Sequence, residues 1–341
     1  MFVNLATDPA FRLSELTDSI NILPNKYGRL GEAAGGLNLF PFKGVRLRSV
    51  SIEEQNGVLN LIQSQPVGAP GQANKTGKRK VRTFTIPHFP LDDIVLPEDV
   101  DGVRAFGQQD VLKTIQGEVL DRLQGMKNKH DITLEHLRMG ALKGIILDAD
   151  ATEIYNLYTE FGIVQKSVDF VLGTAGTEVS EKIRELVRHI ENNLKGEVTT
   201  SIRCLVSAEF WDKFIKHATI KDIYKNYEAS QRILGGDVRK GFTVNGVTFE
   251  EYSGTATDAA GNARRFIASG EGHAFPEGTM DTFRTLGSPA DFNETVNTIG
   301  LQYYAKFDQR KHGRGYDLHT QSNVLALCKR PAVLVRVHSS N

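Results

Sequence analysis

The stretch that decides the fold is LRMGALKGIILDADATEIYNLYTEFG, residues 137–162. It begins with the end of an amphipathic helix, continues into the apolar run 145–147, and passes through the acidic segment 148–152 to a second strand. A change in apolar period from about 3.6 to about 2 residues marks the passage from helix to strand. The pattern therefore predicts a helix that leads directly into a β-hairpin over 144–161.

Apolar side chains upstream of this stretch recur at helical spacing. They are Leu112, Ile115, Val119, Leu123, Met126, Leu134, Leu137 and Ala141. One long amphipathic helix over about 109–143 fits this pattern, with 128–131 as the place where it could bend.

Residues 45–88 have the sequence pattern of a long β arm. Two β-type runs, 45–52 and 58–62, flank Asn56-Gly57, which is a strong signal for a tight hairpin. Residues 66–77 are rich in glycine and proline and bury too little apolar area to offset their ordering entropy, so we expect a mobile tip. The alternation resumes at 78–88, where Phe84 and Ile86 share one face.

The rest of the chain mixes helices and strands without a repeating βαβ pattern, which predicts an α+β fold. Residues 1–44 have scattered apolar clusters and read as an arm that packs on something else. We expect a helix at 178–194, a strand followed by a helix over 202–217, a polar segment after it, and a hairpin around Asn245-Gly246. Further strands are expected at 264–268, 301–308 and 324–337.

Composition narrows the functional classes. The 341 residues carry 41 basic and 41 acidic side chains, and this balance argues against a protein whose affinity rests on neutralising phosphates. The two cysteines, Cys204 and Cys328, are too few for a disulfide framework and are expected in the core. No leader or apolar run of membrane length is apparent, so we expect no membrane partner.

The segment Asp148-Ala149-Asp150-Ala151-Thr152 resembles the strand-end motif of haloacid-dehalogenase-type phosphatases. There the first aspartate attacks phosphorus, the second acts as acid and base, and Mg²⁺ bridges them. That motif normally opens its domain, whereas here it follows a long helix, and Asp237 has no acidic companion nearby. The alternative is that Asp148 and Asp150 accept backbone hydrogen bonds in a tight turn.

Other candidate sites have simpler interpretations. His130 and His136 lie six residues apart on the predicted helix, so they face different sides and are expected at the surface or an interface. Phe210, Trp211 and Phe214 are expected in a core. No nucleotide-binding, hydrolase or metal motif is present in the sequence, so we expect no cofactor.

A basic run follows the predicted mobile tip, and aspartates lie shortly after it. The run could touch nucleic acid, with Phe84 as a stacking residue, or could pair with aspartates across an interface between subunits. We favour the interface. The candidate interface residues are Arg46, Arg48, Lys78, Arg79, Lys80, Arg82, Phe84, Asp92 and Asp93.

Taken in order, these segments resemble the major capsid protein E family of lambda-like tailed phages, which has the Hong Kong 97-type capsid fold. The segments that carry the resemblance are the arm 45–88, LPEDVDGVRAFG at 96–107, the stretch 137–162 and VSAEFWDKFIKHATIKDIYKNY at 206–227. The family commonly has glycine in the hairpin turn where this chain has Ala151.

The resemblance implies a division of the chain into five parts. These are an N-terminal arm (1–44), an extended loop (45–88), a peripheral domain with a spine helix at about 109–143 (89–200), an axial domain (201–299) and C-terminal strands that return to the peripheral domain (300–341).

The resemblance also implies a structural function without catalysis. The subunits would form hexamers and pentamers of an icosahedral shell around phage DNA, which they would contact non-specifically. Scaffolding, portal and decoration proteins are implied partners, and the implied location is the virion capsid, assembled in the host cytoplasm. Since an isolated two-stranded ribbon is at best marginally stable, the arm 45–88 is expected to lie on an adjacent copy.

Overall fold

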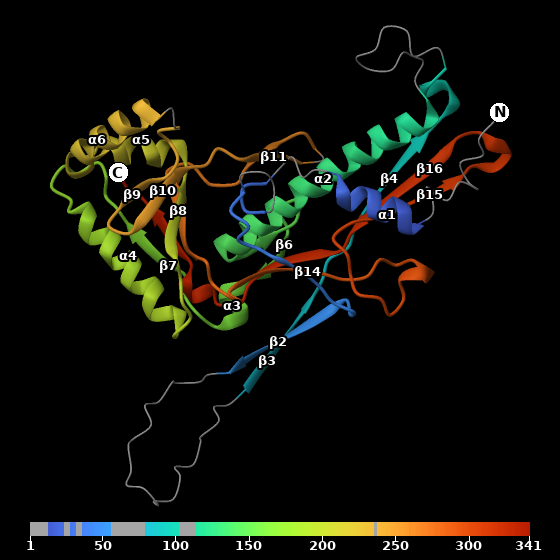
Figure 1. Cartoon of the computed structure of the whole chain (residues 1–341). Helices are drawn as coiled ribbons and strands as arrows, with labels where there is room; N and C mark the ends of the chain where they lie inside the picture. The colour runs from blue at the N-terminus through green and yellow to red at the C-terminus, as the bar shows by residue number, and fades with distance from the viewer. Residues whose placement is uncertain are drawn as a thin grey trace, which may run out of the picture.

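The computed structural model describes residues 13–23, 28–31, 36–55, 79–101, 114–234, 237–258 and 260–341. Helices and strands follow one another without a repeating βαβ unit, and the strands form several separate sheets (Figure 1). The predicted α+β class is confirmed. Within the described ranges, no helix has the length and apolar character needed to cross a bilayer.

Helix α2 (Ile115–Lys143) is 29 residues long and runs diagonally through the molecule (Figure 1). The hydroxyl of Thr114 caps it by accepting a hydrogen bond from the Gly117 amide at 3.0 Å. The helix ends at Gly144, where φ is +81° and an added Cβ would lie 2.3 Å from the Tyr158 ring.

The predicted end of this helix at 143 is confirmed, and the helix is assigned without interruption through 128–131. The predicted start at 109 is wrong. Thr114 has an extended backbone and acts as the N-cap, so the helix begins one residue later, at Ile115. Residues 109–113 lie outside the described part of the chain.

The first half of α2 packs on a three-stranded antiparallel sheet. Its order is β15 (Tyr304–Gln309), β16 (Tyr316–Ser322) and β4 (Phe89–Val95). Helix α1 (Leu13–Ile22) covers the same apolar cluster, in which Leu16 and Ile20 are buried. The described part of the N-terminal segment therefore packs on this chain's own helix and sheet.

A six-stranded mixed sheet lies at the other end of the molecule (Figure 1). Its strands, in order, are β7 (Lys166–Asp169), β18 (Val335–His338), β13 (Glu271–Glu277), β8 (Ser201–Val206), β10 (Val247–Glu251) and β9 (Phe242–Val244). The helices that pack against it are α4 (Val179–Leu194), α5 (Ala208–Lys216) and α6 (Ala218–Leu234). The reversal predicted at Asn245-Gly246 joins β9 to β10, which confirms that hairpin.

Aromatic side chains fill the space between this sheet and its helices. Phe214 on α5 packs against Phe249 on β10 with ring centroids 4.5 Å apart, and Phe210 and Trp211 are also buried. Cys204 is buried in the same cluster, as is Cys328. These core predictions are confirmed, whereas the predicted polar segment after α5 is in fact helix α6, one side of which packs on the core.

The remaining strands form one more sheet and three two-stranded ribbons, of which β2–β3 projects from the body of the molecule (Figure 1). A third sheet has the order β1 (Phe42–Gly44), β14 (Phe283–Gly287) and β17 (Val324–Cys328). Three two-stranded ribbons are β2 (Ser49–Gln55) with β3 (Arg79–Thr85), β5 (Ile145–Leu147) with β6 (Glu153–Asn156), and β11 (Thr255–Thr257) with β12 (Ala263–Arg265). Short 3-10 helices lie at Pro97–Asp99, Asn293–Thr295, Lys311–Gly313 and Pro331–Val333.

Two boundaries differ from the predictions. The hairpin 144–161 ends earlier, because Asn156 caps the short helix α3 (Leu157–Phe161) by accepting hydrogen bonds from two backbone amides. In addition, β7 and β18 pair in parallel inside the six-stranded sheet, so these strands group with the predicted axial segment 201–299. Pairing between strands so distant in sequence leaves no local signal, so it could not be predicted from the sequence.

Candidate intersubunit surface and anchoring network

The root of the β2–β3 ribbon carries Arg46, Leu47 and Arg48, all exposed. Backbone hydrogen bonds fix this segment on both sides. The Val45 amide donates to the Gly287 carbonyl at 2.8 Å, and the Ile86 amide donates to the Arg48 carbonyl at 2.7 Å. Among the described residues, neither guanidinium forms an ion pair. The segment is thus held in place while its side chains point to solvent.

Arg82 and Phe84 anchor the ribbon to this chain's own hairpin and helix α3. The Arg82 guanidinium lies 4.5 Å from the Phe161 ring centroid and donates to the Glu160 carbonyl at 2.7 Å. Phe84 is fully buried, with its ring edge-on to Tyr155 at 5.2 Å. Phe84 is therefore covered by its own chain, which removes it as a base-stacking residue.

The remaining basic candidates lie further out on the ribbon. Arg79 and Lys80 belong to β3, in register with Gln55 and Glu54 of β2. Residues 49–55 therefore pair with residues 79–85 in this ribbon. Lys78, the turn predicted at Asn56-Gly57 and the tip predicted at 66–77 lie outside the described residues.

The two candidate aspartates on β4 have partners within the chain. Asp93 accepts from Arg122 of α2 at 2.9 Å, and the same guanidinium contacts Asp99 at 3.1 Å. Hydrogen bonding to Glu118 and these carboxylates raises the pKa of Arg122. Asp92 pairs with His319, but its side chain stays 79% exposed, so it remains accessible from outside the subunit.

Asp148 and Asp150 are turn residues. The Asp148 side chain accepts from the Ala149 amide at 2.7 Å, and Asp150 accepts from the Thr152 amide at 2.9 Å. Hydrogen bonds from Thr152 lower the pKa of Asp150. Ala151 has a φ of +72°, the conformation for which glycine is usual. Both carboxylates are thus used to close the hairpin, and no group of three potential metal ligands occurs among the described residues.

His130 is buried under a sheet of its own chain, whereas a position at the surface or an interface was predicted for it. Its Nε2 lies 2.9 Å from the Thr320 hydroxyl, and burial lowers its pKa to about 4. Beside it, fully buried Lys127 pairs with Asp131 at 3.4 Å and lies 4.7 Å from the Tyr303 ring centroid. Helical spacing placed His130 correctly on α2, but the sheet that covers it comes from distant residues and leaves no local signal.

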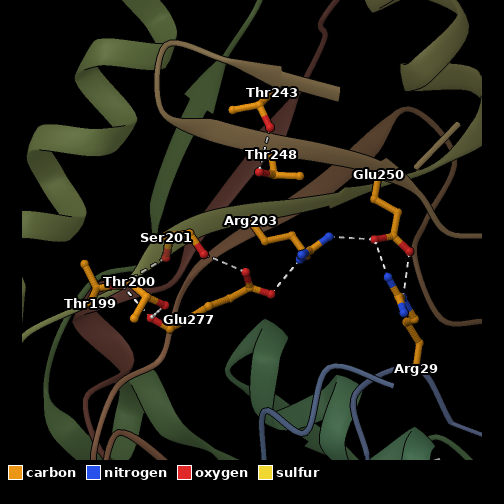
Figure 2. A network of polar contacts seen from close by, with 9 residues as sticks. All are labelled: Arg29, Thr199, Thr200, Ser201, Arg203, Thr243, Thr248, Glu250 and Glu277. Atoms are coloured by element: carbon orange, nitrogen blue, oxygen red, sulfur yellow. Dashed lines mark hydrogen bonds and ion pairs between the residues drawn. The ribbon is translucent and has the colours of Figure 1, made fainter. Parts of the chain in front are cut away.

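A chain of ion pairs on the six-stranded sheet was not predicted (Figure 2). Glu250 on β10 is 1% exposed and accepts from Arg29 at 2.7 and 2.8 Å and from Arg203 on β8 at 2.8 Å. Arg203 also binds Glu277 on β13, which accepts from the Ser201 hydroxyl at 2.8 Å. The hydrogen bond to Glu250 raises the pKa of Arg29.

The same N-terminal segment is also held from the side of α2. Glu135, which is 1% exposed, accepts from the backbone amides of Arg29 and Leu30 at 2.6 and 2.9 Å. Burial raises the pKa of Glu135. Residues 28–31 thus bridge the long helix and the six-stranded sheet, and we call this segment the strap. No sequence pattern pointed to this segment.

Residues 12–339 match the family described as phage major capsid protein E. The chain belongs to this family. It is 30% identical over 342 residues to the major capsid protein of Pseudomonas phage KPP10, with 96% of both chains covered. It is 28% identical over 360 residues to the major capsid protein of Salmonella phage Felix O1, again with 96% of both chains covered. The mature capsid of bacteriophage PhiM1 has a similar fold, with a TM-score of 0.50 and 13% identity over 89% of this chain and 86% of that one.

This member of the phage major capsid protein E family therefore has the Hong Kong 97-type capsid fold and serves as a structural subunit of a virion shell. The phosphatase alternative is overturned, because the relatives are capsid proteins and the aspartates close a turn. The predicted family and shell function are confirmed.

Proposed function

We propose that this shell subunit assembles into pentamers and hexamers through the root of its β2–β3 ribbon. The observation that carries the proposal is the exposed segment Arg46-Leu47-Arg48, fixed by backbone hydrogen bonds and without an ion pair among the described residues. A backbone that is already fixed at the surface loses little further freedom on binding, and arginine is one of the residue types that dominate interfaces.

Apolar side chains next to this segment support the proposal. Leu47 is 69% exposed, and Val296 and Ile299 on the neighbouring loop are 66% and 57% exposed. The Gly300 amide donates to the Val45 carbonyl at 2.9 Å, so this loop lies directly beside the ribbon root. Exposed apolar groups flanked by arginines have the composition of an interface core and its rim.

The division of the molecule belongs to the same proposal. We assign α2 and the β15-β16-β4 sheet to a peripheral domain, and the six-stranded sheet with α4 to α6 to an axial domain. The outer part of the ribbon, with Lys78, Arg79 and Lys80, would extend toward an adjacent copy. The proposal also includes scaffolding, portal and decoration proteins as partners and non-specific contact with packaged DNA. It further includes assembly in the host cytoplasm and the absence of catalysis.

Negative-stain electron microscopy of the purified protein tests it. Wild-type protein is expected to form closed shells or rings, whereas the double variant Arg46→Glu with Arg48→Glu is expected to stay unassembled yet folded. The matched control reverses Arg184 and Arg188, which are exposed on α4. Shells from the ribbon-root variant, or equal loss of assembly in the control, would remove the support for this surface.

A further inference from the structure

The turn between β15 and β16 presents a compact basic group. Its sequence is Arg-Lys-His-Gly-Arg-Gly, residues 310–315, and Lys311, His312 and Arg314 are exposed. None of these three forms an ion pair among the described residues. We call residues 310–314 the basic tip.

The basic tip has a defined conformation. The Arg310 amide donates to the Gly315 carbonyl at 3.0 Å, and the Gly313 amide donates to the Arg310 carbonyl at 3.1 Å. An added Cβ on Gly315 would lie 2.4 Å from the Val95 carbonyl oxygen, so the turn backbone rests against the end of β4. The charges are therefore carried on a preformed turn, which lowers the entropy lost on binding.

An acidic groove lies on the same sheet. It has a volume of about 630 Å³ and is lined by Asp92, Asp93, Asp291, Asp308, Asp317 and one cation, Lys306. Asp93 and Asp317 are neutralised by Arg122 and Arg310, at 2.9 and 2.8 Å. Lys306 already pairs with Glu294 at 3.2 Å.

The groove keeps an excess of negative charge, and apolar side chains form part of its lining. Asp308 forms no ion pair among the described residues, and Asp92 is 79% exposed beside His319. Ile94, which is 39% exposed, and Phe292 line the same groove. Long basic side chains suit such a site, because their methylene stems can cover apolar surface while their charged ends meet carboxylates.

We propose that the basic tip of one copy enters the acidic groove of an adjacent copy in the shell. This inference rests on the proposed function, since it names a second contact surface between subunits. Each copy carries both the tip and the groove, so the contact can repeat around a ring or be exchanged across a two-fold axis. Opposite charges at both surfaces also disfavour wrong pairings between two tips or two grooves.

Packaged DNA is the competing partner for the basic tip. Asp308, which forms no ion pair among the described residues, lies opposite Asp317 in the hairpin just below the tip, where its charge would repel a phosphate backbone. A DNA contact would also leave the excess charge of the groove without a partner. The tip and groove together therefore favour a second copy of this chain.

Charge exchange tests the pairing. The tip variant carries Lys311→Glu and Arg314→Glu, the groove variant carries Asp92→Lys and Asp308→Lys, and the exchanged chain carries all four. Each double variant is expected to raise the concentration needed for shell formation by about tenfold or more, and the exchanged chain to restore it to within about threefold of wild type. Fluorescence of Trp211, which is 2% exposed, shows that each subunit is folded.

An arm variant, Arg79→Glu with Lys80→Glu, is the matched control, and combining it with the groove variant is expected to give no rescue. The pairing is overturned if the tip variant assembles like wild type, if it only encapsidates less DNA, if the folded exchanged chain does not assemble, or if the arm variant is rescued instead. If wild-type protein forms no shells, the proposed function fails as well.

Discussion

Replacing Glu250 by glutamine is expected to destabilise the unassembled subunit by about 3 kcal/mol. Glu250 is 1% exposed and accepts three hydrogen bonds from Arg29 and Arg203, each 2.7 to 2.8 Å long. Glutamine keeps the shape but presents an NH2 group to a guanidinium and removes the charge that both arginines share. Removal of one partner from a buried ion pair costs about 3–5 kcal/mol. The lower end applies because Arg29 and Arg203 are 23% and 17% exposed.

Urea unfolding of dissociated subunits, followed by Trp211 fluorescence, measures this loss. Arg29→Met leaves Glu250 with Arg203 and is expected to cost less, about 1–2 kcal/mol. The double variant should then lose at least about 1 kcal/mol less than the sum of the two single variants. Asp222→Asn breaks an exposed pair with Lys225 and should change stability by less than about 0.5 kcal/mol. A loss below about 1 kcal/mol for Glu250→Gln, or strict additivity, would refute the role assigned to the network.

Three further predictions concern single positions. Ala151→Gly should stabilise the subunit by about 0.5–1 kcal/mol in thermal unfolding, because Ala151 has a φ of +72°, whereas Ala149→Gly should give no gain. The contribution of His130 to the free energy of unfolding should be complete above about pH 6.5 and should be lost as the pH drops toward 4. Burial lowers the pKa of His130 from 6.5 to about 4, so only the unfolded chain gains the proton in that window. This contribution is about 3 kcal/mol, and His130→Gln should flatten the dependence of the urea midpoint on pH; an unchanged slope would contradict it. Phe84→Ala should lower the free energy of unfolding in urea by about 3–5 kcal/mol because the ring is fully buried. Val81→Ala, at a position that is 59% exposed, should lower it by less than about 1 kcal/mol, and equal losses would contradict the core position of Phe84.

Local patterns in the sequence predicted much of the fold correctly. The long helix, its end before Gly144, the Asp148 turn and the Asn245-Gly246 hairpin follow from residues close to one another in the chain. Their signals are periodicity, capping and turn chemistry, all of which operate over a few residues.

The parts that the sequence did not predict depend on distant partners. Helix α6 is an exception, because Ile220, Tyr224 and Tyr227 recur at helical spacing and this local signal was overlooked among the polar residues. His130 was predicted at the surface or an interface because its partner within the chain, Thr320, lies 190 residues away. Among the interface candidates, the exposed positions Arg46 and Arg48 remain proposals, while Phe84 turned out to be covered by its own chain.

The pairing of β4 with β16 determines when the subunit can become competent for assembly. Leu91 and Thr320 are in register although they lie 229 residues apart in the sequence. In the same way, β7 can pair with β18 only after β18 has been synthesised. Contacts this distant form slowly, since the entropy of closing a large loop is lost before any pairing is gained. During synthesis, the acidic groove has no β16 wall and the basic tip does not yet exist. A nascent chain therefore presents neither surface until β16 has emerged from the ribosome.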